Sequence, residues 1–339
     1  MLSNLKGDAR PVSLIEDTAV KVEDLPAYMD DFQQILDKYK LSCVFHAHIG
    51  TGELHLRPIL NLKDPHDVEL FRTLAYEIAH LVKRYRGSMS GEHGDGRVRG
   101  ELIPIIIGDE NFARLHDLKK AWDPNGIFNP GKIVDVPDMR SSLRYEPGRS
   151  EPDIQTYFDF SKTGGIVRAT EKCNGSGDCR KTEITGGTMC PSYMATRNEK
   201  DVTRARANIL REFLTHSTKK NPFDHHEIKE VMDLCLSCKA CKSECPSSVD
   251  VAKLKAEFLQ HYYEAHGIPL RTRLIANITQ INRLGSIMPG VFNFFMQNPV
   301  LAPLFMRLFG FAPQRRMPLL ANKTLRKKVS SYKDALLPG

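Results

Sequence analysis

Cysteine spacing gives the strongest chemical signal in this sequence of 339 residues. The run Cys235-Leu-Ser-Cys238-Lys-Ala-Cys241-Lys-Ser-Glu-Cys245-Pro246 has the spacing with which bacterial ferredoxins hold a 4Fe-4S cluster. Two residues between neighbouring thiolates let a tight turn present three sulfurs to one cluster. The fourth cysteine, which precedes a proline, then points towards a second cluster. The spacing therefore predicts a protein that transfers electrons.

A second group of cysteines supplies the sulfurs that a pair of clusters needs. In a crossed arrangement, each cluster takes three sulfurs from one group and one from the other. The first cluster is then held by Cys190, Cys235, Cys238 and Cys241. The remaining set, one sulfur short, is Cys173, Cys179 and Cys245. That second site holds a three-iron cluster, takes a ligand other than cysteine, or is empty.

Other uses of cysteine fit the spacing less well. A zinc ribbon needs two separated Cys-x-x-Cys pairs rather than a compact triplet followed by Cys-Pro. A disulfide framework belongs to oxidising compartments, whereas clustered cysteines without a signal peptide suit a reducing one. Cys43 lies alone in an apolar run and is expected to be a buried core thiol.

Histidines form a second constellation, in His46-Ala-His48-Ile-Gly-Thr-Gly-Glu-Leu-His55. The apolar flanks and the glycines predict two strands joined by a tight turn. A two-residue turn centred on Thr51-Gly52 would place His48 directly opposite His55, with His46 on the same face but farther from the turn. Directly paired residues have Cβ atoms ~5 Å apart, close enough for both imidazoles to bind one metal ion.

A glycine-rich loop, Ser88-Met-Ser-Gly-Glu92-His93-Gly-Asp-Gly96, follows a predicted helix. Glycines let the backbone approach a ligand closely. Two histidines and a carboxylate suit a zinc ion with an open coordination position, where a bound oxygen is polarised. Glu92 would complete such a site, while the adjacent His93 faces the substrate as a base. The alternative is that these histidines are ordinary core or surface groups.

Apolar periodicity and end signals predict the elements that position these residues. Helices are expected at 25–38, 65–86, 109–122, 201–215, 224–234 and 249–266, with strands between residues 43 and 60. From about Val136 to Gly165 the chain is rich in Pro, Gly, Ser and charge, which indicates a linker. The predicted divisions are 1–135, a linker at 136–164, a helical cysteine-bearing domain at 165–270, and an apolar, basic helical tail at 271–339.

The composition is that of an ordinary globular chain, with 41% hydrophobic and 26% charged residues and a net charge of +7. The late basic segments carry no DNA- or RNA-binding motif, so we expect no nucleic-acid partner. They are solvated helix faces, or a docking surface for an acidic partner or an anionic membrane leaflet. In the apolar stretch 284–313, prolines and Arg307 prevent an uninterrupted span of the ~20 residues that a membrane helix needs. We expect a core or partner-facing helical pair there, with shallow membrane or quinone docking as the alternative.

Residues 1–135 resemble the C-terminal half of FAD-linked D-2-hydroxy-acid dehydrogenases. These enzymes belong to the vanillyl-alcohol oxidase superfamily and include D-lactate dehydrogenases, glycolate oxidase and D-2-hydroxyglutarate dehydrogenase. The matching pieces are His48-Ile-Gly-Thr-Gly-Glu-Leu-His55, Ser90-Gly-Glu-His-Gly-Asp-Gly96 and Asp123-Pro-Asn-Gly-Ile-Phe-Asn-Pro-Gly-Lys132. At Thr51 and Glu53 the relatives usually have aspartate and asparagine.

The cysteine-bearing part resembles the helical ferredoxin module of the large fused members of this family. The matching pieces are Cys173-Asn-Gly-Ser-Gly-Asp-Cys179-Arg180 and Met189-Cys-Pro-Ser-Tyr193. The resemblance implies an α+β fold class: the oxidase half, an antiparallel sheet with helices, followed by a mostly α-helical ferredoxin domain. The nucleotide-binding half of the family has no counterpart here, so the chain is expected to be a fragment that needs that half for activity.

The resemblance also implies a reaction and its residues. His48, His55 and Glu92 would hold a divalent metal, with zinc expected first and manganese or iron also suited to the ligands. His93 would be the catalytic base, and Asn129 and Lys132 would lie near the flavin. A D-2-hydroxy acid of the lactate or 2-hydroxyglutarate class would be oxidised through FAD. Electrons would pass through 4Fe-4S clusters to a quinone or a protein carrier.

Two competing interpretations remain. The chain could be a non-enzymatic electron-transfer subunit that docks on a separate flavoprotein, or an iron-sulfur protein that senses redox state. The expected location is the cytoplasm. Peripheral contact with the inner face of the membrane is a further expectation.

Overall fold

The computed structural model describes residue 5 and residues 7–330. The chain divides into two compact units: unit 1 contains residues 1–218 and 226–257, and unit 2 contains residues 219–225 and 258–339. The end of the predicted tail, residues 331–339, lies outside the described residues.

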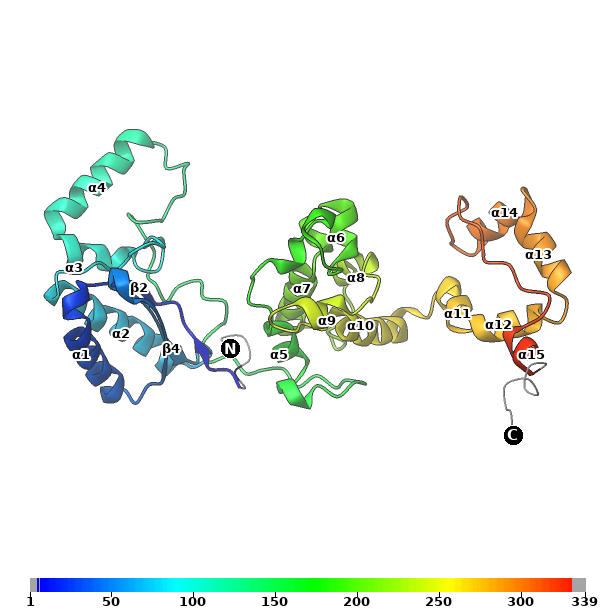
Figure 1. Ribbon diagram of the computed structural model, residues 1–339, viewed down its shortest axis with the longest axis horizontal. Coiled ribbons are helices and arrows are strands. Elements are labelled where there is room, and N and C mark those ends of the chain that lie inside the picture. The colour runs from blue at the N-terminus through cyan, green and yellow to red at the C-terminus, as the bar shows by residue number, and fades with distance from the viewer. Residues whose placement is uncertain (1–4, 6, 331–339) are drawn as a thin grey trace, which may run out of the picture. The chain divides into compact units, whose positions relative to one another are not determined.

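An antiparallel sheet of four strands organises the first part of unit 1 (Figure 1). Strand β4 (Glu53–Leu60) pairs with each of the other three, which are β1 (Arg10–Pro11), β2 (Ile15–Ala19) and β3 (Cys43–His48). We call residues 7–139, which contain this sheet and its helices, the sheet module.

Alternation along β4 gives the sheet two different faces. Leu54, Leu56 and Leu60 are buried in the hydrophobic core, whereas His55 and Arg57 are only partly buried. Because successive side chains of a strand point to opposite faces, the histidine lies on the face away from that core. The sequence thus separates the packing face from the face on which polar side chains can meet.

Two long helices supply the other side of that core. They are α1 (Leu25–Lys38) and α2 (Pro65–Arg84). The Asp64 side chain caps α2 by accepting a hydrogen bond from the His66 amide at 2.9 Å, and Pro65 occupies the first turn. Two further helices complete the module: α3 (Ile103–Ile107) and α4 (Asp109–Trp122).

The turn between β3 and β4 differs from the predicted one. His48 is paired with Glu53, and His46 is paired with His55, so the prediction that His48 lies directly opposite His55 is wrong. A 3-10 turn at Ile49–Thr51 followed by Gly52, with φ of 76°, makes the connection longer than two residues. The longer turn shifts the register by two residues on one strand. A register shift of two residues leaves each side chain on the same face of the sheet. His48 and His55 are therefore still diagonal neighbours on that face.

Helices also dominate the rest of unit 1. We call residues 160–257 the cysteine module. Its helices are α5 (Ile166–Glu171), α6 (Pro191–Thr196), α7 (Thr203–His216), α8 (His226–Asp233), α9 (Ala240–Glu244) and most of α10 (Val251–His266). Together with the sheet module, this confirms the predicted α+β class with a helical ferredoxin-like region. The exact domain boundaries stay predictions.

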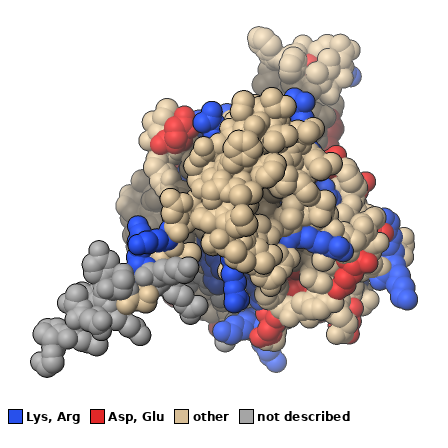
Figure 2. Space-filling view, turned by 90° about the vertical axis from the view of Figure 1, so that its right-hand side faces the viewer, with Lys and Arg blue, Asp and Glu red and all other residues tan. Residues whose placement is uncertain are grey.

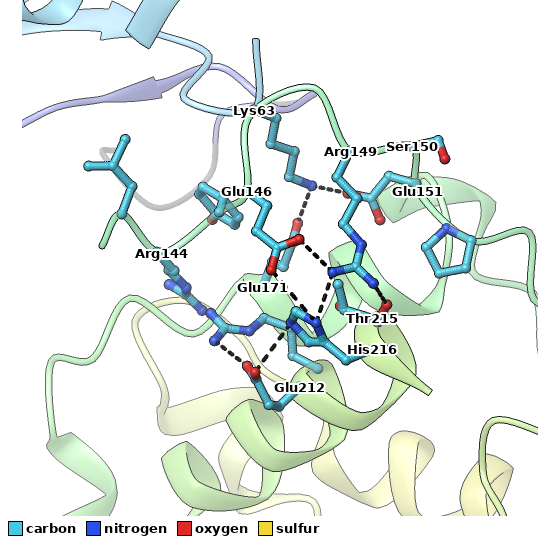
Figure 3. A pocket seen from close by; sticks show the side chains of 14 residues that line it. Lys63, Arg144, Glu146, Arg149, Ser150, Glu151, Glu171, Glu212, Thr215 and His216 are labelled. Atoms are coloured by element: carbon cyan, nitrogen blue, oxygen red, sulfur yellow. Dashed lines mark hydrogen bonds and ion pairs between the residues drawn. The ribbon is translucent and has the colours of Figure 1, made fainter. Parts of the chain in front are cut away.

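A charged hollow joins the two modules of unit 1 (Figure 3). The Lys63 side chain is only 12% exposed, and its ammonium lies 2.8 Å from Glu171 of α5 and also contacts Glu151 of the connecting segment. Burial lowers the pKa of Lys63, but its hydrogen bonds to Glu151 and Glu171 raise it above the ordinary value overall. Farther along the hollow, Arg149 contacts Glu146 and His216. Cations and carboxylates are paired across this hollow, so it holds the connecting segment against both modules.

Short helices make up most of unit 2. They are α11 (Leu270–Ala276), α12 (Ile278–Gly285), α13 (Pro289–Gln297), α14 (Leu301–Leu308) and α15 (Leu325–Ser330). Over residues 5 and 7–330, we find no helix with the length and apolar character needed to cross a membrane.

Candidate active site and iron-sulfur site

A bulge in β2 organises the loop that carries Glu92 and His93. The pairing of β2 with β4 shifts between Glu16 and Thr18, which leaves Asp17 with φ of 87° and its side chain fully buried. We call residues 88–96 the site loop.

The Asp17 carboxylate accepts three hydrogen bonds from the site loop. Its donors are the Ser90 hydroxyl at 2.6 Å, the Glu92 amide at 2.9 Å and the His93 amide at 2.8 Å. Burial alone would raise the pKa of Asp17, but these bonds hold it far below the ordinary value of 3.8. The nearly buried Arg99 guanidinium lies 3.5 Å away and adds a compensating charge. Asp17 therefore fixes the direction in which Glu92 and His93 project.

Glu92 is the point at which the predicted metal ligands meet. Its Oε1 atom lies 3.7 Å from His48 Nε2 and 3.5 Å from His55 Nε2. The rings of His48 and His55 are 5.1 Å apart between centroids. These side chains come from β3, β4 and the site loop, so the fold brings together the set that the sequence suggested.

Two overlapping groups of donor atoms surround Glu92. One group is Asp17, His55, Glu92 and His93, and the other is His48, Glu53 and Glu92. Within each group the donor atoms lie within 4.8 Å of one another. Imidazole nitrogens and carboxylate oxygens bind first-row divalent metals, so the donor set fits a metal ion. An Oε1 atom of Glu53 and the Nδ1 atom of His55 are buried without a described hydrogen-bond partner, which favours a further ligand at this place.

His93 occupies the edge of this cluster. Its Nε2 atom lies 3.0 Å from Glu92 Oε1, and its Nδ1 atom lies 3.6 Å from Glu16 Oε1 on β2. Its ring is stacked on His55 with 5.0 Å between centroids. Both ring nitrogens of His93 therefore face a carboxylate, and the nearer carboxylate is that of Glu92. This arrangement is compatible with the predicted role of base.

Three acidic residues of the site were not singled out from the sequence as site residues. Glu16 and Asp17 lie in the short strand β2, far from the site loop in sequence, and the bridge between Ala19 and Ser88 brings that strand to the loop. Glu53 joins the cluster because the turn places it opposite His48. A hydrogen bond with Asp17 raises the pKa of Glu53, and burial and the Glu92 charge act in the same direction. Adjacent acidic residues inside a strand were the available signal for Glu16 and Asp17.

The residues predicted to lie near the flavin are on an exposed turn after α4. Asn129 and Lys132 are both exposed, and the Asn129 backbone is left-handed with φ of 46°. The Ile133 amide next to Lys132 donates to Gly96 of the site loop at 2.8 Å. The turn is thereby attached to the site loop, although neither predicted side chain enters the donor cluster.

Four cysteines line one cavity in the cysteine module: Cys190, Cys235, Cys238 and Cys241. These are the sulfurs predicted for the first cluster. No three cysteine sulfurs in the described part of the chain lie within 4.8 Å of one another. Each thiolate of a 4Fe-4S cluster binds a different iron, so its sulfurs are spread around the cluster, whereas the ligands of one zinc ion converge.

Hydrogen bonds and charge around the cavity also fit an anionic cluster. Cys190 Sγ accepts from the Thr203 amide at 3.1 Å and lies 2.9 Å from its hydroxyl. The buried Arg206 side chain lines the same cavity, and its Nη2 atom hydrogen-bonds no described group. Lys255 donates to the Cys235 carbonyl at 2.7 Å. Amide donors and buried cations stabilise the negative charge of cluster thiolates.

The cysteines predicted for the second site differ in burial. Cys173 and Cys179 are buried, and Cys245 is partly buried. Burial raises the pKa of the Cys179 thiol to about 11, and the nearby Cys190 and Cys173 thiols act in the same direction. A second cluster at Cys173, Cys179 and Cys245 stays a prediction. The isolated Cys43 is partly buried beside the core rather than fully buried.

Comparison with known proteins agrees with both halves of this description. Residues 1–133 match the family described as FAD linked oxidases, C-terminal domain, and residues 172–250 match the 4Fe-4S dicluster domain. The chain is 32% identical to the D-2-hydroxyglutarate dehydrogenase of Pantoea ananatis (strain AJ13355), over 98% of this chain and 35% of that protein. It is 31% identical to the protein of the same name in Escherichia coli (strain K12), over 99% of this chain and 36% of that protein.

A more distant similarity covers only the first part of the chain. Glycolate oxidase subunit GlcD of Bacillus subtilis (strain 168) is 27% identical over 37% of this chain and 26% of that protein. The chain spans about a third of the length of the D-2-hydroxyglutarate dehydrogenases that it matches.

These matches confirm the predicted family and support the predicted FAD and 4Fe-4S cofactors. The divalent metal and the role of each site residue stay predictions. Residues 1–133 therefore belong to the C-terminal domains of FAD-linked oxidases, and residues 172–250 form a 4Fe-4S dicluster domain.

Proposed function

We propose that this chain takes part in the FAD-dependent oxidation of a D-2-hydroxy acid to the 2-oxo acid, with electrons leaving by way of iron-sulfur chemistry. The observation that carries the proposal is the meeting of His48, His55 and His93 at Glu92, in a domain of the FAD-linked oxidase family. The names of the relatives favour 2-hydroxyglutarate as substrate, and lactate is the alternative of the same class.

The site residues would divide the chemistry between them. When bound, FAD accepts a hydride, a divalent metal acts as a Lewis acid and a 4Fe-4S cluster carries single electrons. His48, His55 and Glu92 would hold the metal, for which zinc is our first choice. His93 would take the proton of the substrate hydroxyl. Asp17 would keep the site loop in place without touching the substrate.

A flavin-binding half would have to cover the exposed edge of the sheet module. Large apolar side chains are exposed at two places in the sheet module: Ile49 at the β3–β4 turn, and Trp122, Ile127 and Phe128 before Asn129. Exposed apolar groups of this size favour burial against another protein surface. They support a flavin-binding domain as the partner, with Asn129 and Lys132 at its border.

Electron transfer would end on a quinone or a protein carrier. The electrons would leave this chain from the cysteine-lined cavity at Cys190. Contact with the membrane would follow if the acceptor is a quinone.

Replacement of His93 tests the catalytic proposal. In an assembly that contains the flavin-binding half, His93→Gln should lower the turnover of D-2-hydroxyglutarate or D-lactate by about 100- to 10,000-fold, the usual contribution of a general base. The matched control is His66→Gln, because His66 is an exposed histidine at the start of α2. Dye reduction under saturating substrate measures the rate.

The same experiment separates the competing function, a non-enzymatic electron-transfer subunit. The cysteine-lined cavity alone would satisfy that alternative. Unchanged turnover in His93→Gln would support a docking role for the sheet module and would contradict the catalytic proposal.

A further inference from the structure

The segment from residue 267 to residue 325 has an unusual charge pattern. It contains no aspartate or glutamate, and its basic residues are Arg271, Arg273, Arg283, Arg307, Arg315, Arg316 and Lys323. All of these basic side chains are exposed. We call this stretch, which lies in unit 2, the cationic segment. Such a one-sided charge attracts anionic partners and repels a second copy of itself.

The cationic segment also exposes large apolar side chains. More than half of the exposed large hydrophobic residues in the described part of the chain lie between Ile268 and Val329. The most exposed are Leu325 at 76%, Ile287 at 75% and Leu308 at 74%. Between residues 267 and 325, only Met296 and Met306 are buried hydrophobic residues. This segment therefore leaves most of its large apolar side chains exposed to water, which is costly unless something covers them.

Apolar and basic side chains alternate along the same short helices. On α12, Arg283 precedes the exposed Leu284, and on α14, Arg307 lies between the exposed Leu304 and Leu308. In Figure 2, residues other than Lys, Arg, Asp and Glu fill the middle of the face, and both basic and acidic side chains lie around it. The acidic ones lie outside the cationic segment, which contains none. An apolar centre with a cationic margin is the pattern of proteins that rest in the interface of an anionic membrane.

We propose that the cationic segment docks the protein on the surface of an anionic lipid bilayer. The exposed apolar side chains of α12, α13 and α14 would enter the headgroup and upper acyl region, while the arginines contact lipid phosphates. A fluid bilayer accepts apolar residues from several short helices and turns without needing a complementary shape. The inference extends the proposed function by naming the surface that would bring the protein to a membrane acceptor.

Vesicle co-sedimentation tests the proposal on the full chain. Vesicles of phosphatidylcholine with phosphatidylglycerol should retain the protein, vesicles of phosphatidylcholine alone should retain much less, and added salt should release part of the bound protein. The variant Arg283→Gln/Arg307→Gln should bind about 30-fold more weakly, since each basic residue near an anionic surface changes affinity about fivefold. The variant Ile287→Ser/Leu308→Ser should bind more weakly even in high salt.

A control variant separates this surface from general charge. Lys21→Gln/Lys120→Gln removes the same charge from exposed positions in unit 1 and should bind like the unaltered chain. The substituted residues are all exposed, so folding should be retained, and circular dichroism checks this.

Two results would overturn the proposal. One is equal retention by both kinds of vesicle, or by neither. The other is self-association in sedimentation velocity that the Ile287→Ser/Leu308→Ser variant abolishes, because a second copy would then cover the apolar face. The measurement needs no substrate, so failure here would leave the proposed oxidation untouched.

Discussion

Replacing Asp17 by asparagine is the sharpest test of how the site loop is held. Asparagine has the shape of aspartate but carries no charge and replaces one acceptor oxygen with a donor. Asp17 receives the Ser90 hydroxyl and the Glu92 and His93 amides, all from the site loop. Whichever way the new amide group is turned, at least one of those donors loses its acceptor.

The cost follows from these contacts. An unpaired buried donor costs about 1–3 kcal/mol, and bonds to a neutral acceptor are worth roughly half of those to a charged one. The buried Arg99 also loses the charge that faces it at 3.5 Å. Asp17→Asn should therefore destabilise the folded site loop by about 3–5 kcal/mol. A loss of about 4 kcal/mol corresponds to roughly 1,000-fold less protection of an amide that exchanges by local opening.

Hydrogen exchange of residues 88–96 measures this loss directly. The amides of Glu92 and His93 should be well protected in the unaltered chain and almost unprotected in Asp17→Asn. Asp30→Asn is the matched control, because Asp30 is exposed on α1 and its loss changes the net charge equally. Metal affinity should fall with the protection, by about 10- to 100-fold, because the loop that carries Glu92 is no longer fixed.

The dependence on pH has a definite sign. Since the pKa of Asp17 in the folded chain is well below 3.8, its stabilisation is fully present above about pH 4 and is lost as the pH falls towards the folded pKa. Asp17→Asn should show no such loss. Full protection of Glu92 and His93 in Asp17→Asn would refute the view that Asp17 positions the loop.

Three further predictions concern the rest of unit 1. His55→Ala should weaken binding of a divalent metal by at least about 100-fold in a titration of the metal-free chain, whereas the exposed His66→Ala should not. Cys190→Ala should lose the visible absorbance and the paramagnetic signal of the first cluster, whereas Cys43→Ala should keep both; equal loss in the two variants would contradict the ligand assignment. Lys63→Met leaves Glu151 and Glu171 without their buried cation and should cost about 3–5 kcal/mol, seen as faster proteolysis of residues 143–152. Lys162→Met, at an exposed position, is its control, and equal proteolysis of the two variants would contradict the role of Lys63.

Local signals explain what could be predicted from the sequence. The predicted bounds of α1 and α4 agree with the structure, because apolar periodicity, proline at a helix start and the Asp123-Pro124 break act within a few residues. The cysteine spacing is equally local, and Cys235, Cys238 and Cys241 of that run do line one cavity, together with the more distant Cys190. Matching motifs were also sufficient to identify the family, which the comparisons confirm.

Long-range contacts explain what the sequence did not reveal. The pairing of His48 with Glu53 depends on the length of the turn between β3 and β4. The 3-10 conformation of that turn cannot be predicted from any single residue. Asp17 reaches the site loop because β2 is bridged to that loop at Ala19 and Ser88, and more than 70 residues of chain separate Asp17 from Ser90. Residue type suggested the roles of His48, His55, Glu92 and His93. The structure shows that these side chains lie close together, but it does not test their chemistry.

Anaerobic analysis of iron, labile sulfide and divalent metals in the purified chain tests the central claim most directly, together with paramagnetic resonance after dithionite reduction. The account predicts about four irons and four sulfides per chain, a signal of a reduced 4Fe-4S cluster, and one further divalent metal that His55→Ala removes. About eight irons would mean that Cys173, Cys179 and Cys245 also hold a full cluster. Zinc without any sulfide would contradict the electron-transfer account.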